Sequence, residues 1–310
     1  MALIQPPLAV NGATHSARVF RMMIRNLAWS NQGVIEGNDL KVRQMTTPGA
    51  GVRVGDGAGT ILGATSRTQG AYTQTNIGDT AVPIAPTGAS ARNDLIVLRV
   101  MDPEYEGTLN PETQDIGFFD VISGVSSTTT QPPAGMTAIP LARVQIPANT
   151  ATITDSMIKD VRRIANPRRE RTLKTAFPSA LSELKYSDNK WHTWPTAGQW
   201  PVAIPSWATS ATVIVSVAGL RMTRANVFAK MQTSIGGDLG QETVIDDNQG
   251  NVTRRQTVVV ADTINISAAQ RGTTQTLKLS TYMYKTETGD LSVDGGTSIV
   301  ADIEFVEGLV

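Results

Sequence analysis

The chain has 310 residues, of which 17% are charged, and its formal net charge is zero. A neutral chain has no global field to recruit nucleic acid or an anionic membrane. It contains no cysteine, which excludes disulfides, thiolate metal sites and a cysteine nucleophile. The N-terminal residues lack the basic and apolar regions of a secretory signal, and no apolar run reaches the length of a membrane span. We therefore expect synthesis in the cytoplasm without a signal peptide, and no insertion into membranes.

One helix is predicted near the N-terminus, in "THSARVFRMMIRNLAW". Its apolar side chains recur at helical spacing, and its basic side chains occupy a second face. The apolar face comprises Ala17, Phe20, Ile24 and Leu27, and the basic face comprises Arg18, Arg21 and Arg25. We expect a short helix packed on a sheet edge, with Phe20 and Ile24 directed inward and Arg21 and Arg25 outward.

The remaining chain has the pattern of an all-β protein. Glycine (27 residues), proline (16 residues) and many Thr, Ser and Val residues favour short strands joined by turns. "GVRVGDGAGTILG", residues 51–63, resembles a phosphate-binding loop, but no helix follows its glycines, as such a loop requires. We interpret it as a β-hairpin with Val52 and Val54 in one arm, Ile61 in the other, and a glycine-rich turn between them. No cofactor is expected.

Three segments are expected along the chain. Residues 1–165 form a first β domain, residues 166–177 a basic linker, and residues 178–310 a distal β-sandwich of jelly-roll type. Just before the linker, Met157, Ile158, Val161 and Ile164 have the spacing of a short helix that ends before Pro167. In a trimer, their apolar stripes would meet on the axis, with Arg168, Arg169 and Arg171 paired outward or to neighbouring chains.

The entry to the distal domain holds four of the five tryptophans: Trp191, Trp194, Trp200 and Trp207. Two interpretations remain open. Exposed indole rings stack on the apolar faces of sugars, which predicts contact with a glycan. Tryptophans interspersed with prolines also close one end of a sandwich, and this structural role is the more frequent one because Trp is usually buried.

Catalytic and metal-binding patterns are scarce. "DPEYEG" brings together Asp102, Glu104 and Glu106, which suit either a glycosidase pair or, more commonly, a turn with solvated charges. "DDNQGN", residues 246–251, lacks the ligand spacing of a calcium loop and is interpreted as a hairpin turn. The only histidines, His15 and His192, neighbour no serine motif and no second metal ligand. We expect no metal, no cofactor and no enzymatic activity.

The order of several short motifs in the first half resembles a known family. "PPLAVNGATHSARVFR", "GVIEGNDLKV", "QGAYTQTN", "RNDLIVLRVMDPEYEG", "IPLARVQIP" and "IKDVR" follow one another over residues 1–165. This order is similar to that in upper baseplate and minor tail proteins of long-tailed (siphovirus-type) phages of actinobacteria. The resemblance implies a homotrimer that attaches a receptor-binding arm to the tail tip. The chain departs from long fibre proteins because it lacks a heptad or collagen-like shaft.

The leading hypothesis is therefore a virion structural protein of the tail tip or baseplate. Residues 1–165 would dock on other tail proteins, and residues 178–310 would face neighbouring tail proteins or the host surface. One alternative is a carbohydrate-binding module that holds host cell-wall glycan through the Trp191–Trp207 cluster. A second alternative is a polysaccharide-cleaving enzyme with Asp102 and Glu104 or Glu106 as its acids.

Overall fold

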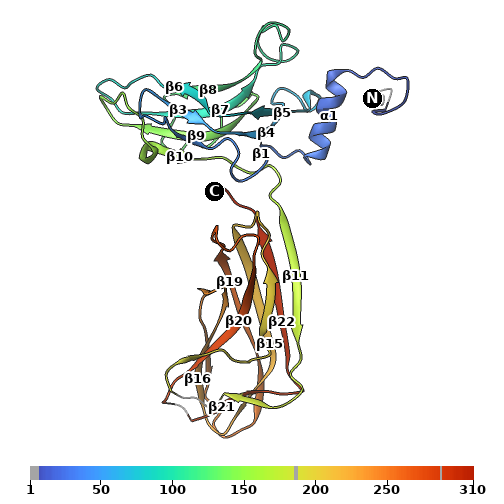
Figure 1. Ribbon diagram of the computed structural model, residues 1–310, viewed down its shortest axis with the longest axis vertical. Helices are drawn as coiled ribbons and strands as arrows, with labels where there is room; N and C mark the ends of the chain where they lie inside the picture. Colours follow the sequence, from blue (N-terminus) through green and yellow to red (C-terminus); the bar gives the residue numbers. More distant parts are fainter. Residues whose placement is uncertain (1–6, 185–187, 287) are drawn as a thin grey trace. The chain divides into compact units, whose positions relative to one another are not determined.

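The computed structural model describes residues 7–184, 188–286 and 288–310 (Figure 1). The chain divides into two compact units. Unit 1 comprises residues 1–167 together with 309–310, and unit 2 comprises residues 168–308. The strands of both units pair in antiparallel sheets, and unit 1 also holds the helix α1 (Ala17–Leu27). The predicted all-β class with a short N-terminal helix is confirmed.

Unit 1 contains three antiparallel sheets and two single-turn 3-10 helices. The first sheet has the order β1-β4-β5, the second β2-β3-β6, and the third β10-β9-β7-β8. Their strands are β1 (Gly33–Val34), β2 (Val42–Gln44), β3 (Gly51–Val54), β4 (Gly57–Leu62), β5 (Ala71–Asn76), β6 (Thr80–Pro83), β7 (Arg92–Val100), β8 (Gly117–Ser123), β9 (Ala138–Ile146) and β10 (Ile158–Asp160). The 3-10 helices are η1 (Arg67–Gln69) and η2 (Asp155–Met157).

The third sheet of unit 1 is covered on both faces. Along β7, Ile96 and Leu98 join the main core of the unit, whereas Leu95 and Val97 pack into a separate apolar cluster. A strand buried on both faces is apolar at consecutive positions instead of alternating ones. The run "LIVL" in the sequence has this pattern.

The glycine-rich stretch is not the hairpin predicted from the sequence. β3 pairs with β2 and β6, whereas β4 pairs with β1 and β5, so the turn between β3 and β4 passes from one sheet to another. Gly57 has a positive φ of 137°, and a Cβ there would lie 2.5 Å from the Cα of Asp39. A Cβ on Gly59 would lie 2.8 Å from Ile139. These two glycines of β4 permit the strand to pack closely against the Asp39 backbone and against Ile139 of β9.

The segment expected to form a helix before the linker holds the end of the 3-10 helix η2 and then the short strand β10. Ile158–Asp160 forms β10 and pairs with β9, and Ile164 bridges Val34 in parallel. Met157, Ile158 and Ile164 pack on the main core of unit 1, and Val161 is buried in its smaller cluster. Because these side chains pack on the core of their own unit, they do not form the free helical stripe expected from the sequence, and the trimer seam stays a prediction.

Unit 2 is a sandwich of two antiparallel sheets. One sheet has the order β11-β22-β15-β21-β12 with β19 also paired to β15; the other has the order β13-β20-β16-β17, with β14 on β20 and β18 on β16. The strands are β11 (Arg169–Ala176), β12 (Ser182–Leu184), β13 (Trp191–His192), β14 (Gln199–Ala203), β15 (Ser210–Thr223), β16 (Val227–Ile235), β17 (Asp238–Leu239), β18 (Thr243–Asp247), β19 (Arg254–Asn265), β20 (Thr274–Met283), β21 (Asp290–Val293) and β22 (Ser298–Val306).

The long strands of unit 2 pair in a nested order. β11 pairs with β22, β14 with β20, β15 with β19, and β16 with β18. This is the order obtained when one long antiparallel hairpin is wound into two sheets, which defines a jelly roll. The sequence-based expectation of a jelly-roll sandwich is therefore confirmed for unit 2.

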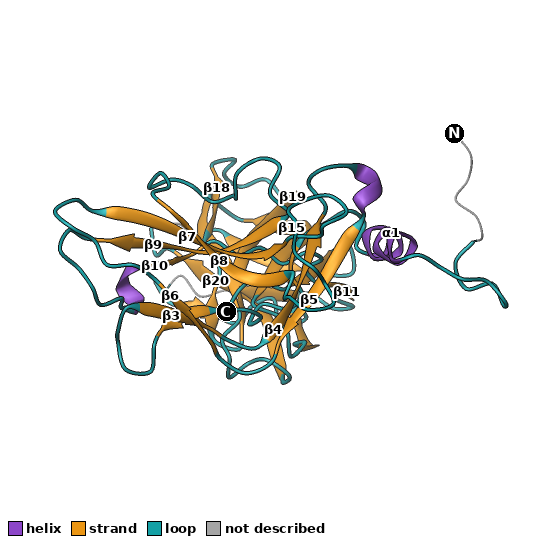
Figure 2. Ribbon diagram, turned by 90° about the horizontal axis from the view of Figure 1, so that it is seen from above, coloured by secondary structure: helices purple, strands orange, loops and turns teal. Residues whose placement is uncertain are grey.

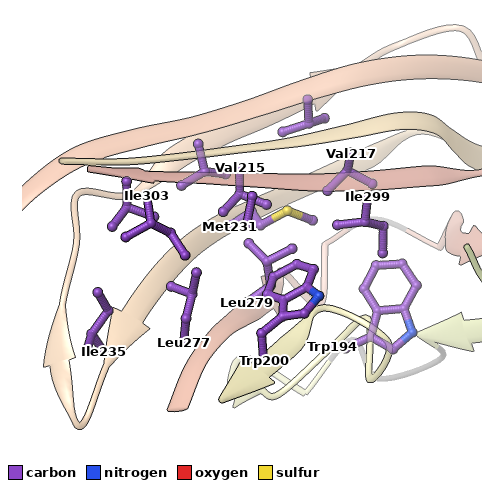
Figure 3. Packing of buried hydrophobic residues seen from close by; sticks show 14 of the residues in the cluster. Trp194, Trp200, Val215, Val217, Met231, Ile235, Leu277, Leu279, Ile299 and Ile303 are labelled. Carbon is purple, nitrogen blue, oxygen red and sulfur yellow. The ribbon is translucent and has the colours of Figure 1, made fainter. Parts of the chain in front are cut away.

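The core of unit 2 lies between its two sheets. Along β15, Val213, Val215 and Val217 point inward and are fully buried, while the residues between them face outward. Ile299 and Ile303 of β22 show the same alternation and meet the side chains of the opposite sheet (Figure 3). This period of two is the pattern of a sheet with one buried face.

Two further local expectations for unit 2 are corrected. Residues 169–176 of the expected linker form the edge strand β11, fully registered with β22. Residues 246–251 include the end of β18 and the start of the connection to β19 in the other sheet, so they lead across the sandwich instead of closing a hairpin. Near this crossing, Arg254 and Asp247 form a buried ion pair. Although burial opposes it, this arginine holds the pKa of Asp247 below its usual value.

Candidate functional site

The helix α1 is attached to unit 1 by a buried arginine. Arg21 is only 9% exposed and donates from Nε to the Gln69 carbonyl oxygen at 2.9 Å. Its Nη1 lies 3.2 Å from Asp102 Oδ2, and its Nη2 lies 2.6 Å from Glu104 Oε2. α1 therefore lies beside η1 and β5 (Figure 2), held by charge-assisted hydrogen bonds instead of an apolar face.

Close backbone approach makes this attachment possible. Gly70 follows η1 with a positive φ of 84°, and a Cβ there would lie 2.5 Å from the carbonyl carbon of Arg21. The guanidinium also lies over the rings of Tyr72 and Tyr105, at 5.5 and 5.4 Å from their centroids. Cation–π contacts of this kind add to the ion pairs.

The acidic turn after β7 supplies the partners of the helix. Tyr72 donates its hydroxyl to Asp102 at 2.7 Å, Arg18 pairs with Glu104, and Arg99 binds Glu106 at 2.5 Å. "DPEYEG" is thus a turn, as expected, but its charges are paired instead of solvated. All three acids are occupied in ion pairs that fix α1 and the β7 end.

Two groups in and beside this turn, Glu104 and Tyr72, have shifted pKa values. Hydrogen bonds from Arg18 and then Arg21 lower the pKa of Glu104 to about 2. Burial, together with the neighbouring Asp102, raises the pKa of Tyr72 well above its usual value. Glu104 therefore remains ionised at neutral pH, as its ion pairs with the helix require.

The orientation of α1 is the reverse of the sequence-based prediction. Arg21 faces inward, while Phe20 and Leu27 face solvent, Leu27 with 71% of its surface exposed. Ile24 and Arg25 are half-buried. Trp29, just beyond the helix, is 84% exposed. We define these three exposed side chains, Phe20, Leu27 and Trp29, as the α1 face.

The α1 face borders a hollow in the surface of unit 1. The hollow is lined by Pro7, Leu8, Val19, Met22, Met23, Asn26 and Leu27. Phe20 and Leu27 are seven residues apart and so lie on the same side of α1. Exposed apolar side chains grouped in this way indicate contact with another molecule. This concentration was not predicted from the sequence, because Phe20 and Leu27 were assigned to the apolar face expected to pack on a sheet edge.

The arginines at the start of unit 2 form ion pairs within their own chain. Arg168 binds Glu307 at 2.6 Å, Arg169 lies 3.5 Å from Glu304, and Arg171 pairs with Asp302. These pairs join β11 to β22 and leave charges along an exposed edge strand, an arrangement that disfavours pairing with further strands. These ion pairs lie within one chain, and the pairing of the three arginines outward or to neighbouring chains stays a prediction.

The four clustered tryptophans occupy different environments. Trp194 and Trp200 are 4% and 7% exposed and point into the core of unit 2 beside Leu279 (Figure 3). Their indole nitrogens donate to Ser182 Oγ and to the Thr175 carbonyl oxygen. These two are core residues, so the glycan contact considered from the sequence is corrected for them.

The other two tryptophans are more accessible but lie apart. Trp207 packs against the core in the loop between β14 and β15, with the Arg168 guanidinium 5.6 Å from its ring centroid. Trp191 lies on β13, which pairs with the Tyr282 end of β20; β14 pairs with the opposite end of that strand. The four residues therefore do not form one surface.

Metal-binding clusters and membrane-spanning helices are both absent from the described residues. Within residues 7–184, 188–286 and 288–310, His, Cys, Asp and Glu side chains form no group of three or more able to hold a metal ion. In the same parts of the chain, no helix has the length and apolar character needed to cross a membrane.

Comparison with known proteins gives distant structural similarity. No known protein family matches the chain, and no curated protein sequence matches it. Among solved structures, the chain is similar to that of the infectious bursal disease virus Gt strain, with 12% identity, coverage of 90% of this chain and 76% of that chain, and a TM-score of 0.30.

Two further structures show similarity at the same low level. The T13 particle of infectious bursal disease virus matches with 11% identity, 94% and 81% coverage, and a TM-score of 0.26. The Cry4Aa toxin from Bacillus thuringiensis matches with 9% identity, 89% and 54% coverage, and a TM-score of 0.22. These scores are too low to support an argument about function, which is made below from the residues of this chain.

Proposed function

We propose that the chain is a non-enzymatic virion structural protein of a phage tail tip or baseplate. In this proposal it assembles as a homotrimer, unit 1 docks on other tail proteins, and unit 2 faces outward. The α1 face is the contact between unit 1 and a neighbouring copy. The observation that carries the proposal is the exposure of Phe20, Leu27 and Trp29 on a helix that is fixed to its own unit by Arg21.

Two features support this assignment. First, the helix is held rigidly through its polar side, so its apolar side is presented to solvent at a defined position, and an interface requires such order. Second, the motif order of residues 1–165 resembles that of tail-tip proteins, which commonly form trimers. Among the described residues the clustered acids are engaged in structural ion pairs, which leaves the polysaccharide-cleaving alternative without an available acid pair.

The test is the native mass of the full chain by light scattering on a sizing column. One chain has a mass of 33.1 kDa, and we expect a species of three times that mass. Replacing Leu27 and Trp29 together by serine should reduce the species to monomer, because the apolar contact is lost. The matched control is Ile77→Ser, because Ile77 is exposed and lies away from α1 in the sequence.

The results separate the proposal from its alternatives. A wild-type monomer over the accessible concentration range would contradict assembly through the α1 face. A trimer that persists in the double serine variant would place the contact elsewhere on the chain. A trimer that dissociates in both the double variant and the Ile77 control would show that the effect is not specific to α1 and would overturn the assignment to α1.

A further inference from the structure

Four aromatic side chains form a continuous row on the outward face of one sheet of unit 2. Trp191 of β13 is directly opposite Tyr282 of β20, and Tyr282 is opposite Lys230 of β16. The backbone N–H of Tyr284 donates to the Phe228 carbonyl oxygen, which places Phe228 and Tyr284 next to this row. We define Trp191, Tyr282, Tyr284 and Phe228 as the aromatic platform.

The strand alternation accounts for the outward direction of the platform. Along β16, Val227, Ala229 and Met231 are fully buried in the core, so Phe228 and Lys230 lie on the opposite face. On β20, Met283 is buried, and the adjacent Tyr282 is half-buried. The platform is therefore built on the rigid face of a sheet and not on a loop.

The rings of the platform contact one another in sequence. The centroids of Trp191 and Tyr282 are 5.6 Å apart, those of Tyr282 and Tyr284 4.9 Å, and those of Tyr284 and Phe228 4.6 Å. Aromatic residues make up only 5% of the chain, so four in mutual contact outside the core is a marked concentration. Each ring is supported by its neighbour and retains an accessible part, with Trp191 the most exposed at 36%.

Charged side chains of both signs flank the platform. The Lys230 ammonium lies 5.8 Å from the Tyr284 centroid and 2.7 Å from Glu242 Oε2. Glu242 and Tyr284 raise the pKa of Lys230, which keeps it protonated. On β18, Asp246 is opposite Phe228. One cation and two carboxylates together offer both donors and acceptors without a strong net charge.

From this arrangement we propose that the aromatic platform binds a neutral glycan. The apolar C–H faces of hexose rings match the accessible faces of Trp191 and Tyr284, and the sugar hydroxyls meet the charged rim of Lys230, Glu242 and Asp246. The carboxylates disfavour nucleic acid and anionic lipid, which need a basic surface. The site requires one copy of unit 2, so it is independent of the trimer proposed above.

The experiment measures binding of the full chain to a panel of soluble neutral hexasaccharides. The panel contains glucose, mannose, galactose and N-acetylglucosamine oligomers, with dextran sulfate and a proline-rich decapeptide as competing ligand classes. Affinity is measured by ligand-observed NMR, which does not depend on tryptophan emission. We expect Trp191→Ala and Tyr284→Ala each to weaken binding of the preferred sugar by roughly tenfold.

A matched control and a second variant make the result decisive. Phe177→Ala removes an exposed aromatic ring elsewhere in unit 2 and should leave the affinity within about twofold of the wild type. If Tyr284→Ala loses its folded circular dichroism spectrum, Trp191→Ala and Lys230→Met decide the question. The proposal is overturned if no neutral sugar binds, if Trp191→Ala and Lys230→Met both bind as the wild type does, or if only the peptide or dextran sulfate binds.

Discussion

Replacing Arg21 by alanine tests the polar attachment of α1 most directly. The change removes the donor to Gln69 and leaves Asp102, which is 8% exposed, without its cation. Removing one partner of a buried ion pair lowers the free energy of unfolding by about 3–5 kcal/mol. Asp102 keeps hydrogen bonds from the Tyr72 hydroxyl and the Glu104 backbone N–H, so we place the cost at the lower end, about 3 kcal/mol.

A loss of this size predicts that α1 opens locally more often in Arg21→Ala. Because the strands of unit 1 have their own core, the loss should fall on α1, whose amide protons would exchange about 100-fold faster. Hydrogen–deuterium exchange followed by mass spectrometry resolves peptides from α1 and from β7 and β9 in one experiment. Arg21→Lys, which keeps the charge but loses the planar fork, should give an intermediate rate.

The matched control is Arg18→Ala. Arg18 pairs with the same Glu104 but is exposed, and exposed pairs contribute little to stability. Exchange in α1 should therefore stay close to the wild-type rate in this variant. If Arg21→Ala and Arg18→Ala gave the same exchange rates in α1, the helix would not be held by the buried arginine, and the reasoning would be refuted.

Three further outcomes are expected from the same contacts. The pKa of Glu104 is lowered from 4.5 to about 2, so its contribution to stability is present above pH 4.5 and is lost as the pH falls toward 2. In urea unfolding, the free energy of unfolding should therefore fall more between pH 5 and pH 2.5 for the wild type than for Glu104→Gln. Gly57→Ala should destabilise the chain by about 1–3 kcal/mol because of its positive φ, whereas Gly88→Ala, with open space at its Cβ, should be nearly neutral in thermal unfolding. Trp200→Ala should cost about 3–5 kcal/mol in denaturant unfolding, and Trp191→Ala about 0.5–1.5 kcal/mol from its ring contact with Tyr282. Equal losses would contradict their different burial.

The alternating pattern of unit 2 made its architecture predictable. "ATVIVSVAGL" and "TSIVADIEFVEG" alternate cleanly, and the corresponding strands β15 and β22 have one buried and one outward face. β11 was missed because its Arg169, Arg171 and Lys174 give an exposed edge strand the composition of a linker. Its pairing with β22 joins residues more than a hundred positions apart, and local patterns carry no record of such pairing.

The turn between β3 and β4 shows another limit of local reasoning. Two short apolar runs around glycines indicate two strands and a sharp turn, and both are present. Whether those strands pair with each other depends on partners elsewhere, here Val42 for Val54 and Tyr72 for Ile61. Strand existence was therefore predictable, and strand pairing was not.

For the sites, the position of α1 was predictable but its orientation was not. Hydrophobic periodicity assigns the apolar face to the interior, and it cannot anticipate acids from a distant turn that neutralise an arginine. The dense acidic turn "DPEYEG" was the only signal of those partners. The tryptophan cluster indicated Trp191 as a candidate contact residue. Tyr282, Tyr284 and Phe228 lie elsewhere in the sequence, and only the register of the sheet places them beside Trp191.

The nested pairing of unit 2 has a consequence for how such chains diversify. Because β11 is the first strand and β22 the last, Arg169 is directly opposite Val306, and the unit is entered and left at neighbouring points on one sheet edge. The chain then returns to unit 1 through Leu309 and Val310. The two connections of such a jelly roll therefore lie next to each other. Another domain whose first and last residues have the same spacing can replace it by recombination without altering the strand pairing of unit 1.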